Sequence, residues 1–168
     1  MRVAVLSDLH GNPFALDAVL ADLEPRSVDE IVCLGDVAIG PFPNETVARL
    51  RELGCPAVMG NWDTWFLEGV TADLILGGHT HLQMLRRLPE ALFANPGSVG
   101  LPFSEGPSGG SLRVSRWAEY VLATAEEEGQ KLEFRRVYYG VDEMLEAART
   151  SGMPHAEWWT SCWSLDHR

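Results

Sequence analysis

Basic side chains are scarce in this chain of 168 residues. It has 13 Lys and Arg residues against 24 Asp and Glu residues, which gives a formal net charge of −11. Sequence-independent binding to nucleic acids needs a basic surface that neutralises phosphates, so this charge argues against stable nucleic-acid binding. Small phosphate-containing substrates remain compatible with it, because bound metal cations can reverse the local field.

Cysteines and long apolar runs are also few. The three cysteines, Cys33, Cys55 and Cys162, are odd in number and lack Cys-x-x-Cys spacing, which favours free thiols over disulfides or a zinc site. The first apolar run ends at Asp8 and is too short for a signal peptide or a membrane span. We therefore expect a cytoplasmic protein with one main domain and no membrane partner.

Polar residues that can bind metals follow the first apolar run. Residues 2–7 predict a buried strand, which leads directly into Asp8 and His10. Residues two apart in an extended segment project to the same face, so both side chains are expected to face one site. Asn12 and Pro13 then predict a turn and the start of a helix. A strand, a polar turn and a helix form a βα unit, which binds ligands beyond the carboxyl end of its strand.

Three further apolar runs end in the same way. Residues 30–34, 56–59 and 73–76 each predict a strand, followed by Gly35-Asp36, Gly60-Asn61-Trp62 and Gly77-Gly78-His79-Thr80-His81. In a parallel arrangement the four strand ends share one edge, so these polar side chains should gather there. The histidine pair repeats the spacing of Asp8 and His10, and neutral imidazole is the commonest metal ligand. Mixed oxygen and nitrogen ligands suit Mn²⁺, Fe, Zn²⁺ or Ni²⁺ better than Ca²⁺ or Mg²⁺.

The combined set resembles the motifs of the calcineurin-like metallophosphoesterases. Four segments stand in the order of those motifs: Asp8-Leu9-His10, Gly35-Asp36, Gly60-Asn61 and Gly78-His79-Thr80-His81. Asn95-Pro96-Gly97-Ser98 is similar to the small bacterial and archaeal phosphodiesterases of that superfamily. The resemblance implies an α/β fold, a four-layer α/β/β/α sandwich with a two-metal centre. It covers residues 1–150, which we expect to form the metallophosphoesterase domain, with a tail over residues 151–168.

The resemblance also implies a role for each motif residue. One metal ion would be held by Asp8, His10 and His81, the second by Asn61 and His79, and Asp36 would bridge the two. Two divalent ions roughly 3.5–4 Å apart, with Mn²⁺ favoured, lower the pKa of a bridging water, whose hydroxide attacks a phosphoester in line. The catalytic residues would be Asp36, Asn61 and His79, and the residues that contact substrate would be Asn12, Asn61 and Trp62.

Two departures from the family pattern bear on activity. Many relatives carry a histidine directly after the Gly-Asn pair, thought to protonate the leaving group, where this chain has Trp62. Indole cannot act as an acid at neutral pH, although it can stack on a base or aryl group. Relatives also have a further strand, ending in a metal-binding histidine, in the segment that is shortened here to residues 62–77. We therefore expect tight metal binding at the His81 site and a weak or empty site at His79.

Two classes of function are compatible with these motifs. The first is a metal-dependent phosphoesterase, acting as a phosphodiesterase on a small or nucleotide-like substrate; a phosphomonoesterase or a dinucleoside polyphosphate hydrolase belongs to the same class. The second is a family member with weak or no activity that serves as a protein-interaction scaffold, as a retromer subunit of this fold does. The missing histidine and the tryptophan-rich tail favour the second, and the metal content of the purified protein separates the two.

The rest of the chain predicts ordinary elements. Residues 82–87 and 91–95 indicate two strands, residues 117–125 and 131–139 a hairpin, and residues 44–53 and 141–150 two helices, the first capped by Asn44. The tail contains Trp158, Trp159 and Trp163, and helical spacing places the last two on one face. That face either packs on the domain's own core or forms a homo-oligomer contact, because tryptophan is enriched at interface hot spots.

Overall fold

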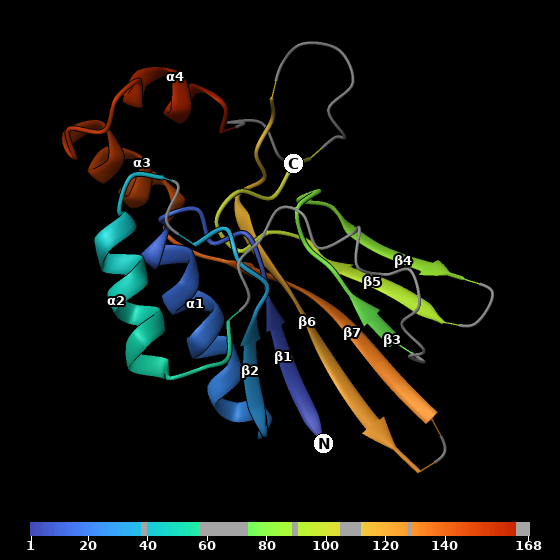
Figure 1. Ribbon diagram of the computed structural model, residues 1–168. Coiled ribbons are helices and arrows are strands. Elements are labelled where there is room, and N and C mark those ends of the chain that lie inside the picture. The colour runs from blue at the N-terminus through green and yellow to red at the C-terminus, as the bar shows by residue number, and fades with distance from the viewer. Residues whose placement is uncertain (38–39, 58–73, 89–90, 105–111, 128, 164–168) are drawn as a thin grey trace.

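The computed structural model describes residues 1–37, 40–57, 74–88, 91–104, 112–127 and 129–163, which form two β-sheets and several helices (Figure 1). The first sheet has the order β2-β1-β6-β7 and contains β1 (Arg2–Leu6), β2 (Glu30–Cys33), β6 (Trp117–Glu126) and β7 (Gly129–Tyr138). The second has the order β3-β5-β4 and contains β3 (Leu74–Leu76), β4 (Gln83–Arg87) and β5 (Leu92–Pro96). The helices are α1 (Pro13–Leu23), α2 (Pro43–Leu53), α3 (Val141–Thr150) and α4 (Ala156–Ser161), with a 3₁₀ turn η1 (Glu24–Arg26).

The mixed α/β fold with two sheets and helices is confirmed. The described helices lie on one side of the first sheet and the second sheet lies on the other (Figure 1). Asn61 and Trp62, with most of the shortened segment of residues 62–77, lie outside the described residues. A single parallel bridge from Cys33 to Ala57 continues the pairing of β2 where the strand of residues 56–59 was predicted.

One expectation about the strand ends was wrong. β1 and β2 run parallel in the first sheet, but β3 belongs to the second sheet, where it pairs in parallel with β5. A run of three apolar residues can pair with either sheet, and its partner, Leu92 to Ala94, comes later in the chain. The polar segment after β3 therefore reaches the other strand ends from a different sheet.

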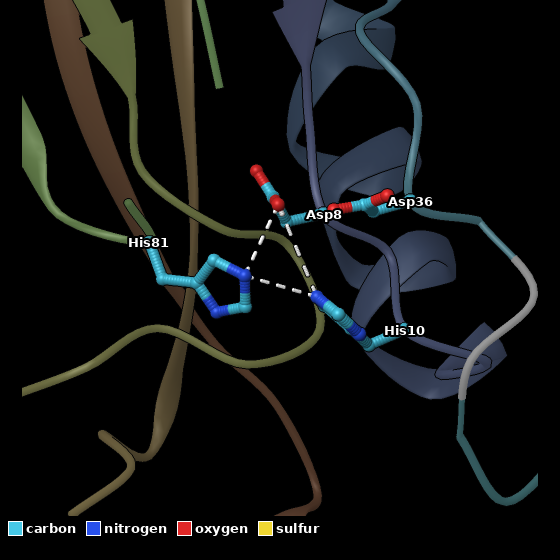
Figure 2. A group of neighbouring side chains, drawn as sticks. All are labelled: Asp8, His10, Asp36 and His81. Carbon is cyan, nitrogen blue, oxygen red and sulfur yellow. Dashed lines mark hydrogen bonds and ion pairs between the residues drawn. The ribbon is translucent and has the colours of Figure 1, made fainter. Parts of the chain in front are cut away.

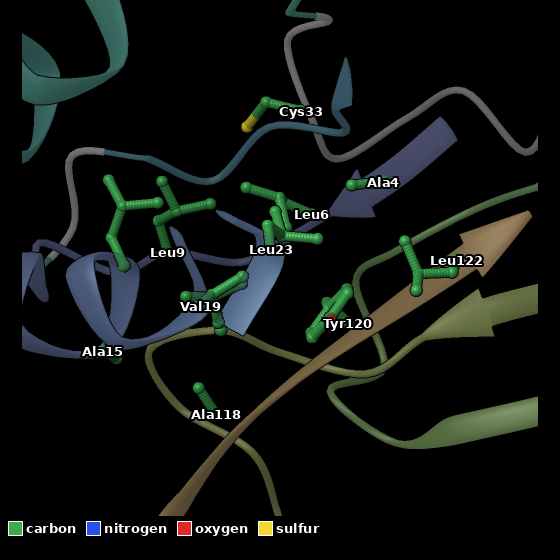
Figure 3. Packing of buried hydrophobic residues seen from close by; sticks show 12 residues of the cluster. Ala4, Leu6, Leu9, Ala15, Val19, Leu23, Cys33, Ala118, Tyr120 and Leu122 are labelled. Atoms are coloured by element: carbon green, nitrogen blue, oxygen red, sulfur yellow. The ribbon is translucent and has the colours of Figure 1, made fainter. Parts of the chain in front are cut away.

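The main core lies between α1 and the first sheet (Figure 3). Alternate residues of β6 face the helix, as the period of two in a strand requires: Ala118, Tyr120 and Leu122 are fully buried there. Leu16 and Val19 on α1 pack against them. Burying a Leu or Val side chain stabilises a fold by about 1.5–3 kcal/mol, so this contact holds β1, which carries the polar segment at its end, firmly in place.

The two long helices begin differently. Asn12 caps α1, because its Oδ1 accepts a hydrogen bond of 3.1 Å from the backbone N–H of Ala15, and Pro13 occupies the first turn. The prediction that Asn44 caps α2 was wrong: the helix begins one residue earlier, at Pro43, and its N-cap Phe42 makes no side-chain hydrogen bond. Proline is favoured at the first position because its fixed φ suits the helix and it has no N–H to satisfy.

The described part of the C-terminal tail, residues 151–163, packs on the rest of the chain. Trp159 and Trp163 are 8% and 2% exposed and form one apolar cluster with Met144 of α3 and with Val114. The backbone N–H of Val114 also donates 2.9 Å to the carbonyl of Cys162. Trp158 points away and is 63% exposed. The tryptophan face predicted from helical spacing therefore contributes to the domain's own interior.

The cysteines are free thiols, as the sequence indicated. Cys33 and Cys162 are buried and Cys55 is half-buried, and burial raises the pKa of Cys33 to about 11. Within the described part of the chain, no helix combines the length and the apolar character needed to cross a membrane.

Candidate metal centre

Four side chains from three segments converge beyond the carboxyl ends of β1 and β2 (Figure 2). Asp8 and His10 follow β1, Asp36 follows β2, and His81 lies in the connection from β3 to β4. Each offers one ligand atom, and these atoms lie within 4.8 Å of one another. Asp36 is half-buried and the other three are buried. All members of this group were singled out from the sequence.

The backbone at these residues is not extended. Asp8, His10, Asp36 and His81 have φ values of 55°, 49°, 50° and 57°, in the left-handed region that L-residues rarely adopt. Strand alternation therefore does not place Asp8 and His10 on one face, because both residues lie beyond the end of β1. Five of the seven non-glycine residues with positive φ in the described chain are predicted ligands, with His79 the fifth. Such strained conformations gather at functional sites.

His81 is oriented by a backbone carbonyl. Its Nδ1 lies 2.8 Å from the carbonyl oxygen of Leu101, and because a carbonyl can only accept, Nδ1 carries the proton. The lone pair of neutral His81 is then on Nε2, which lies 3.0 Å from Nε2 of His10 and 3.1 Å from Oδ1 of Asp8. The ring of Phe103 covers His81, with centroids 4.5 Å apart. Metal-ligating histidines usually donate their second ring N–H in this way.

The two carboxylate oxygens of Asp8 have different surroundings. Oδ2 accepts hydrogen bonds from the Ser7 hydroxyl (2.5 Å) and the backbone N–H of His79 (3.1 Å). Oδ1 is buried and has no hydrogen-bond partner within the described residues. It faces the Nε2 atoms of His81 and His10, at 3.1 and 3.9 Å. This oxygen is the one that points into the group of four.

The pKa values of the two carboxyl groups are pushed apart. Burial raises the pKa of Asp8, but the contacts with His81, Ser7 and the backbone N–H of His79 together outweigh it, and the net pKa is lowered. Burial and then the charge of Asp8 raise the pKa of Asp36. Two carboxylates this close cannot both ionise without cost unless a cation lies beside them.

The donor set fits a divalent transition metal ion. Two imidazole nitrogens and two carboxylates are a ligand combination that such ions accept. The lone pair on His81 Nε2 and the Asp8 Oδ1 face each other at 3.1 Å and repel unless a proton or a cation lies between them. A cation would satisfy Asp8 Oδ1 and both Nε2 atoms together, whereas a single proton satisfies only one contact. The buried, unpartnered Oδ1 is the observation that favours the cation.

His79 lies at the margin of this group. The residue is exposed, and its ring is outside the four-ligand cluster, although its backbone N–H holds Asp8. A positive charge on His79 also lowers the pKa of Asp36, so the two side chains interact electrostatically. Of the second predicted metal site, the structure describes Asp36 and His79, whereas Asn61 lies outside the described residues together with Trp62. The asymmetry between the two sites remains a prediction.

The structure does not support a substrate contact by Asn12. Its side chain is fully buried. Oδ1 caps α1, and Nδ2 donates to the Tyr139 hydroxyl (3.0 Å) and to the Gly100 carbonyl (3.3 Å). Both polar atoms are therefore engaged inside the protein, and the predicted phosphate contact has no free group to make it.

Several residues that shape the site were not assigned a role from the sequence. Gly78 lies so close to Ser7 that an added Cβ would collide with the serine hydroxyl and crowd Asp8 Oδ2, so only glycine allows this approach. The paired glycines before His79 were the signal for it. Leu101 and Phe103 carried no signal, because a backbone carbonyl and an apolar ring cannot be recognised by residue type.

The comparisons with known proteins agree with this geometry. Residues 1–71 match the calcineurin-like phosphoesterase superfamily domain. That match covers the first 71 of the chain's 168 residues, so the likeness to this superfamily in sequence concerns the N-terminal part of the chain. An uncharacterised protein from Methanocaldococcus jannaschii is 50% identical over 72 residues, which are 42% of this chain and 30% of that protein. The chain thus spans less than a third of the length of the curated relative that it matches.

Solved structures show the same fold over nearly the whole chain. A metallophosphoesterase from Sphaerobacter thermophilus superposes with a TM-score of 0.71 at 22% identity, covering 96% of this chain and 98% of that one. Yfce, a phosphoesterase from E. coli, gives a TM-score of 0.56 at 21% identity. The superposition covers 83% of this chain and 100% of that one. At these identities the likeness concerns the fold.

Proposed function

We propose that this protein is a metal-dependent phosphoesterase in which Asp8, His10, Asp36 and His81 hold a divalent cation, with Mn²⁺ favoured. The observation that carries the proposal is the buried Oδ1 of Asp8, which has no hydrogen-bond partner among the described residues and faces two imidazole nitrogens. The family match over residues 1–71 supports it, since that segment includes three of the four ligands.

Divalent cations bound at this site would supply Lewis-acid chemistry, lowering the pKa of a bound water and neutralising the charge that develops on a phosphoryl group. The chain's own residues prepare the site. His81 is held in one orientation by the Leu101 carbonyl, and Asp8 is held by Ser7. We propose that Asp36 is shared by two cations, with His79 and Asn61 at the second.

The proposed substrate is a small phosphodiester of the nucleotide type. Trp62 replaces a residue that would protonate the leaving group, so the substrate should have a leaving group that needs little protonation. An indole can also stack on a nucleobase. The net charge of −11 disfavours long polyanions and leaves small esters.

Hydrolysis of bis-p-nitrophenyl phosphate tests this proposal. The protein is stripped of metal with a chelator, Mn²⁺ is added back, and the rate is followed with and without the substitution Asp36→Asn. We expect Mn²⁺ to restore hydrolysis in the unaltered protein and the Asp36→Asn variant to stay inactive. Asp142→Asn is the matched control, because Asp142 is 81% exposed, pairs with Arg116 and belongs to α3.

Three results would contradict the proposal. The first is no hydrolysis of mono- or diester panels with any divalent metal. The second is a metal content far below one per chain after reconstitution, which would favour the scaffold alternative. Activity that survives in Asp36→Asn would show that this group of residues is not the site of hydrolysis.

A further inference from the structure

A buried hydroxyl lies between the segments that carry Asp8 and His81. Ser98 is fully buried, and its Oγ donates a hydrogen bond of 2.6 Å to the backbone carbonyl of Asp8. The same Oγ accepts a hydrogen bond of 2.8 Å from the backbone N–H of Leu101. The carbonyl of Leu101 in turn accepts from His81 Nδ1. One side chain thus connects the backbone of one ligand to the group that orients another.

A buried amide lies against the segment that carries His79. Asn95 is fully buried, and its Nδ2 donates to the Gly78 carbonyl (2.7 Å) and to the Thr80 hydroxyl (3.0 Å). Its Oδ1 accepts from the backbone N–H of Gly97 (2.9 Å). Asn95 therefore holds the residues on both sides of His79 without touching the imidazole.

We propose that Asn95 and Ser98 are positioning residues of the metal centre, Ser98 for the half that contains Asp8 and His81, and Asn95 for the segment that carries His79. The proposal rests on the proposed function, because it assigns both side chains to a centre that binds a metal. Neither side chain contacts a ligand atom of the group of four, so each acts through the backbone.

The strained backbone is the physical reason for this assignment. Asp8, His79 and His81 have φ values of 55°, 76° and 57°. A residue in the left-handed region relaxes unless its surroundings hold it there. Ser98 holds the carbonyl of Asp8, and Asn95 holds the Gly78 carbonyl and the Thr80 hydroxyl on the two sides of His79. Loss of either side chain should therefore change the geometry of the ligands more than it changes the stability of the whole fold.

Ser98→Ala is tested against Ser115→Ala, which is a closely matched control. Ser115 is also fully buried, but its hydroxyl has no hydrogen-bond partner among the described residues. Co²⁺ is titrated into the metal-free proteins, its visible absorption reports the coordination geometry, and thermal unfolding in chelator reports the stability without metal. We expect Ser98→Ala to weaken Co²⁺ binding about 10–100-fold and to change the absorption bands, and Ser115→Ala to do neither.

A graded variant keeps the test decisive if Ser98→Ala folds poorly. Ser98→Cys keeps a side chain of similar size with a weaker donor, so its Co²⁺ affinity should lie between those of the unaltered protein and Ser98→Ala. For Asn95→Ala we expect the affinity for the first Co²⁺ ion to be unchanged. We expect kcat to fall about tenfold, with KM unchanged. Thr80→Ala removes one of the two hydrogen bonds that Nδ2 of the buried amide donates, and Thr80 itself is exposed. It should therefore lower kcat by less than Asn95→Ala does.

The outcomes separate this inference from the proposed function. If the unaltered protein binds no Co²⁺, the proposed function fails and the inference fails with it. If the unaltered protein binds Co²⁺ and Ser98→Ala binds it with the affinity and spectrum of Ser115→Ala, the inference is overturned and the metal centre stands. Equal Co²⁺ affinity in Ser98→Ala with a lower stability in chelator would make Ser98 a purely structural residue, which also overturns it.

Discussion

Asp8 and Asp22 are two carboxylates of one βα unit with opposite surroundings. Asp22 lies in the last turn of α1, where it accepts hydrogen bonds from Arg26 (2.8 and 3.2 Å), Arg135 (3.2 Å) and the Tyr120 hydroxyl (2.7 Å). These bonds, led by those from Arg26, lower the pKa of Asp22 to about 2. The donors around Asp22 are thus two charged guanidinium groups and one hydroxyl that points at the carboxylate.

Among the described residues, no arginine or lysine forms an ion pair with Asp8. Its contacts are a hydroxyl, a backbone N–H and two histidines, and one of its oxygens has no hydrogen bond within the described residues. A buried charge without a complete set of partners costs free energy. The difference is that Asp22 has its full set of partners within the fold, whereas Asp8 has a buried oxygen that our proposal assigns to a cation.

The largest expected effect concerns Asp8. Replacing it by Asn should weaken Mn²⁺ binding by more than about 100-fold, because a direct ligand matters at least as much as the residues that orient it. Mn²⁺ should then no longer raise the unfolding temperature, while Asp22→Asn should keep the full rise. Calorimetric titration and thermal unfolding measure both. Mn²⁺ stabilisation that persists in Asp8→Asn would remove the distinction between the two carboxylates.

The next effect concerns Asp22. Asp22→Asn should lower the free energy of unfolding in chelator by about 2–3 kcal/mol, because it removes the negative charge and one of the two acceptor oxygens that two arginines and a tyrosine share. Asp17→Asn is the control, since Asp17 is 57% exposed and pairs with a single arginine, and it should cost less than about 1 kcal/mol. Urea unfolding measures both, and equal losses would show that the network around Asp22 contributes nothing special.

A smaller effect should appear as the pH falls. The folded pKa of Asp22 is about 2 against an ordinary value of 3.8, so its contribution is fully present above pH 4 and is lost as the pH falls toward 2. The difference in unfolding free energy between the unaltered protein and Asp22→Asn should shrink across this window by at most about 2 kcal/mol. Urea unfolding at pH 4, 3 and 2 measures it, and a difference independent of pH would contradict the depressed pKa.

The smallest effect concerns one hydrogen bond in the same network. Tyr120→Phe removes the hydroxyl that donates to Asp22 while keeping the buried ring, so it should cost about 1 kcal/mol. It should leave Mn²⁺ binding unchanged. Chemical unfolding and calorimetric titration check the two halves of this prediction, and a change in Mn²⁺ affinity would mean that the two regions are coupled.

Much of the fold could be predicted because its signals are local. The helix over residues 141–150 has the predicted bounds, and the strand ends of the β6–β7 hairpin lie within two residues of the predicted ones. Such elements are specified by periodicity and by turn residues, and these signals lie within a few residues of one another. The sheet that β3 joins could not be predicted this way. Its partner is β5, and β4 lies between the two in the chain.

The candidate site divides in the same way. Asp8, His10, Asp36 and His81 could be proposed from residue type and strand ends, and the structure brings them together. The burial of Asn12 and the carbonyl of Leu101 beside His81 could not be proposed, because each depends on segments about 90 and 20 residues away. Residue type says which atoms can bind a metal, but it does not say which of them the fold leaves without a partner.

By itself the sequence determined the chemistry available to this protein: carboxylates and imidazoles placed after apolar strands, with glycines that allow close approach. These properties belong to short segments and survive without knowledge of the fold. The tertiary structure decided that His81 is buried and oriented while His79 is exposed, although the two lie two residues apart. The physical reason is that burial and hydrogen bonding depend on the Leu101 carbonyl and the Phe103 ring, which only the assembly of both sheets brings to His81.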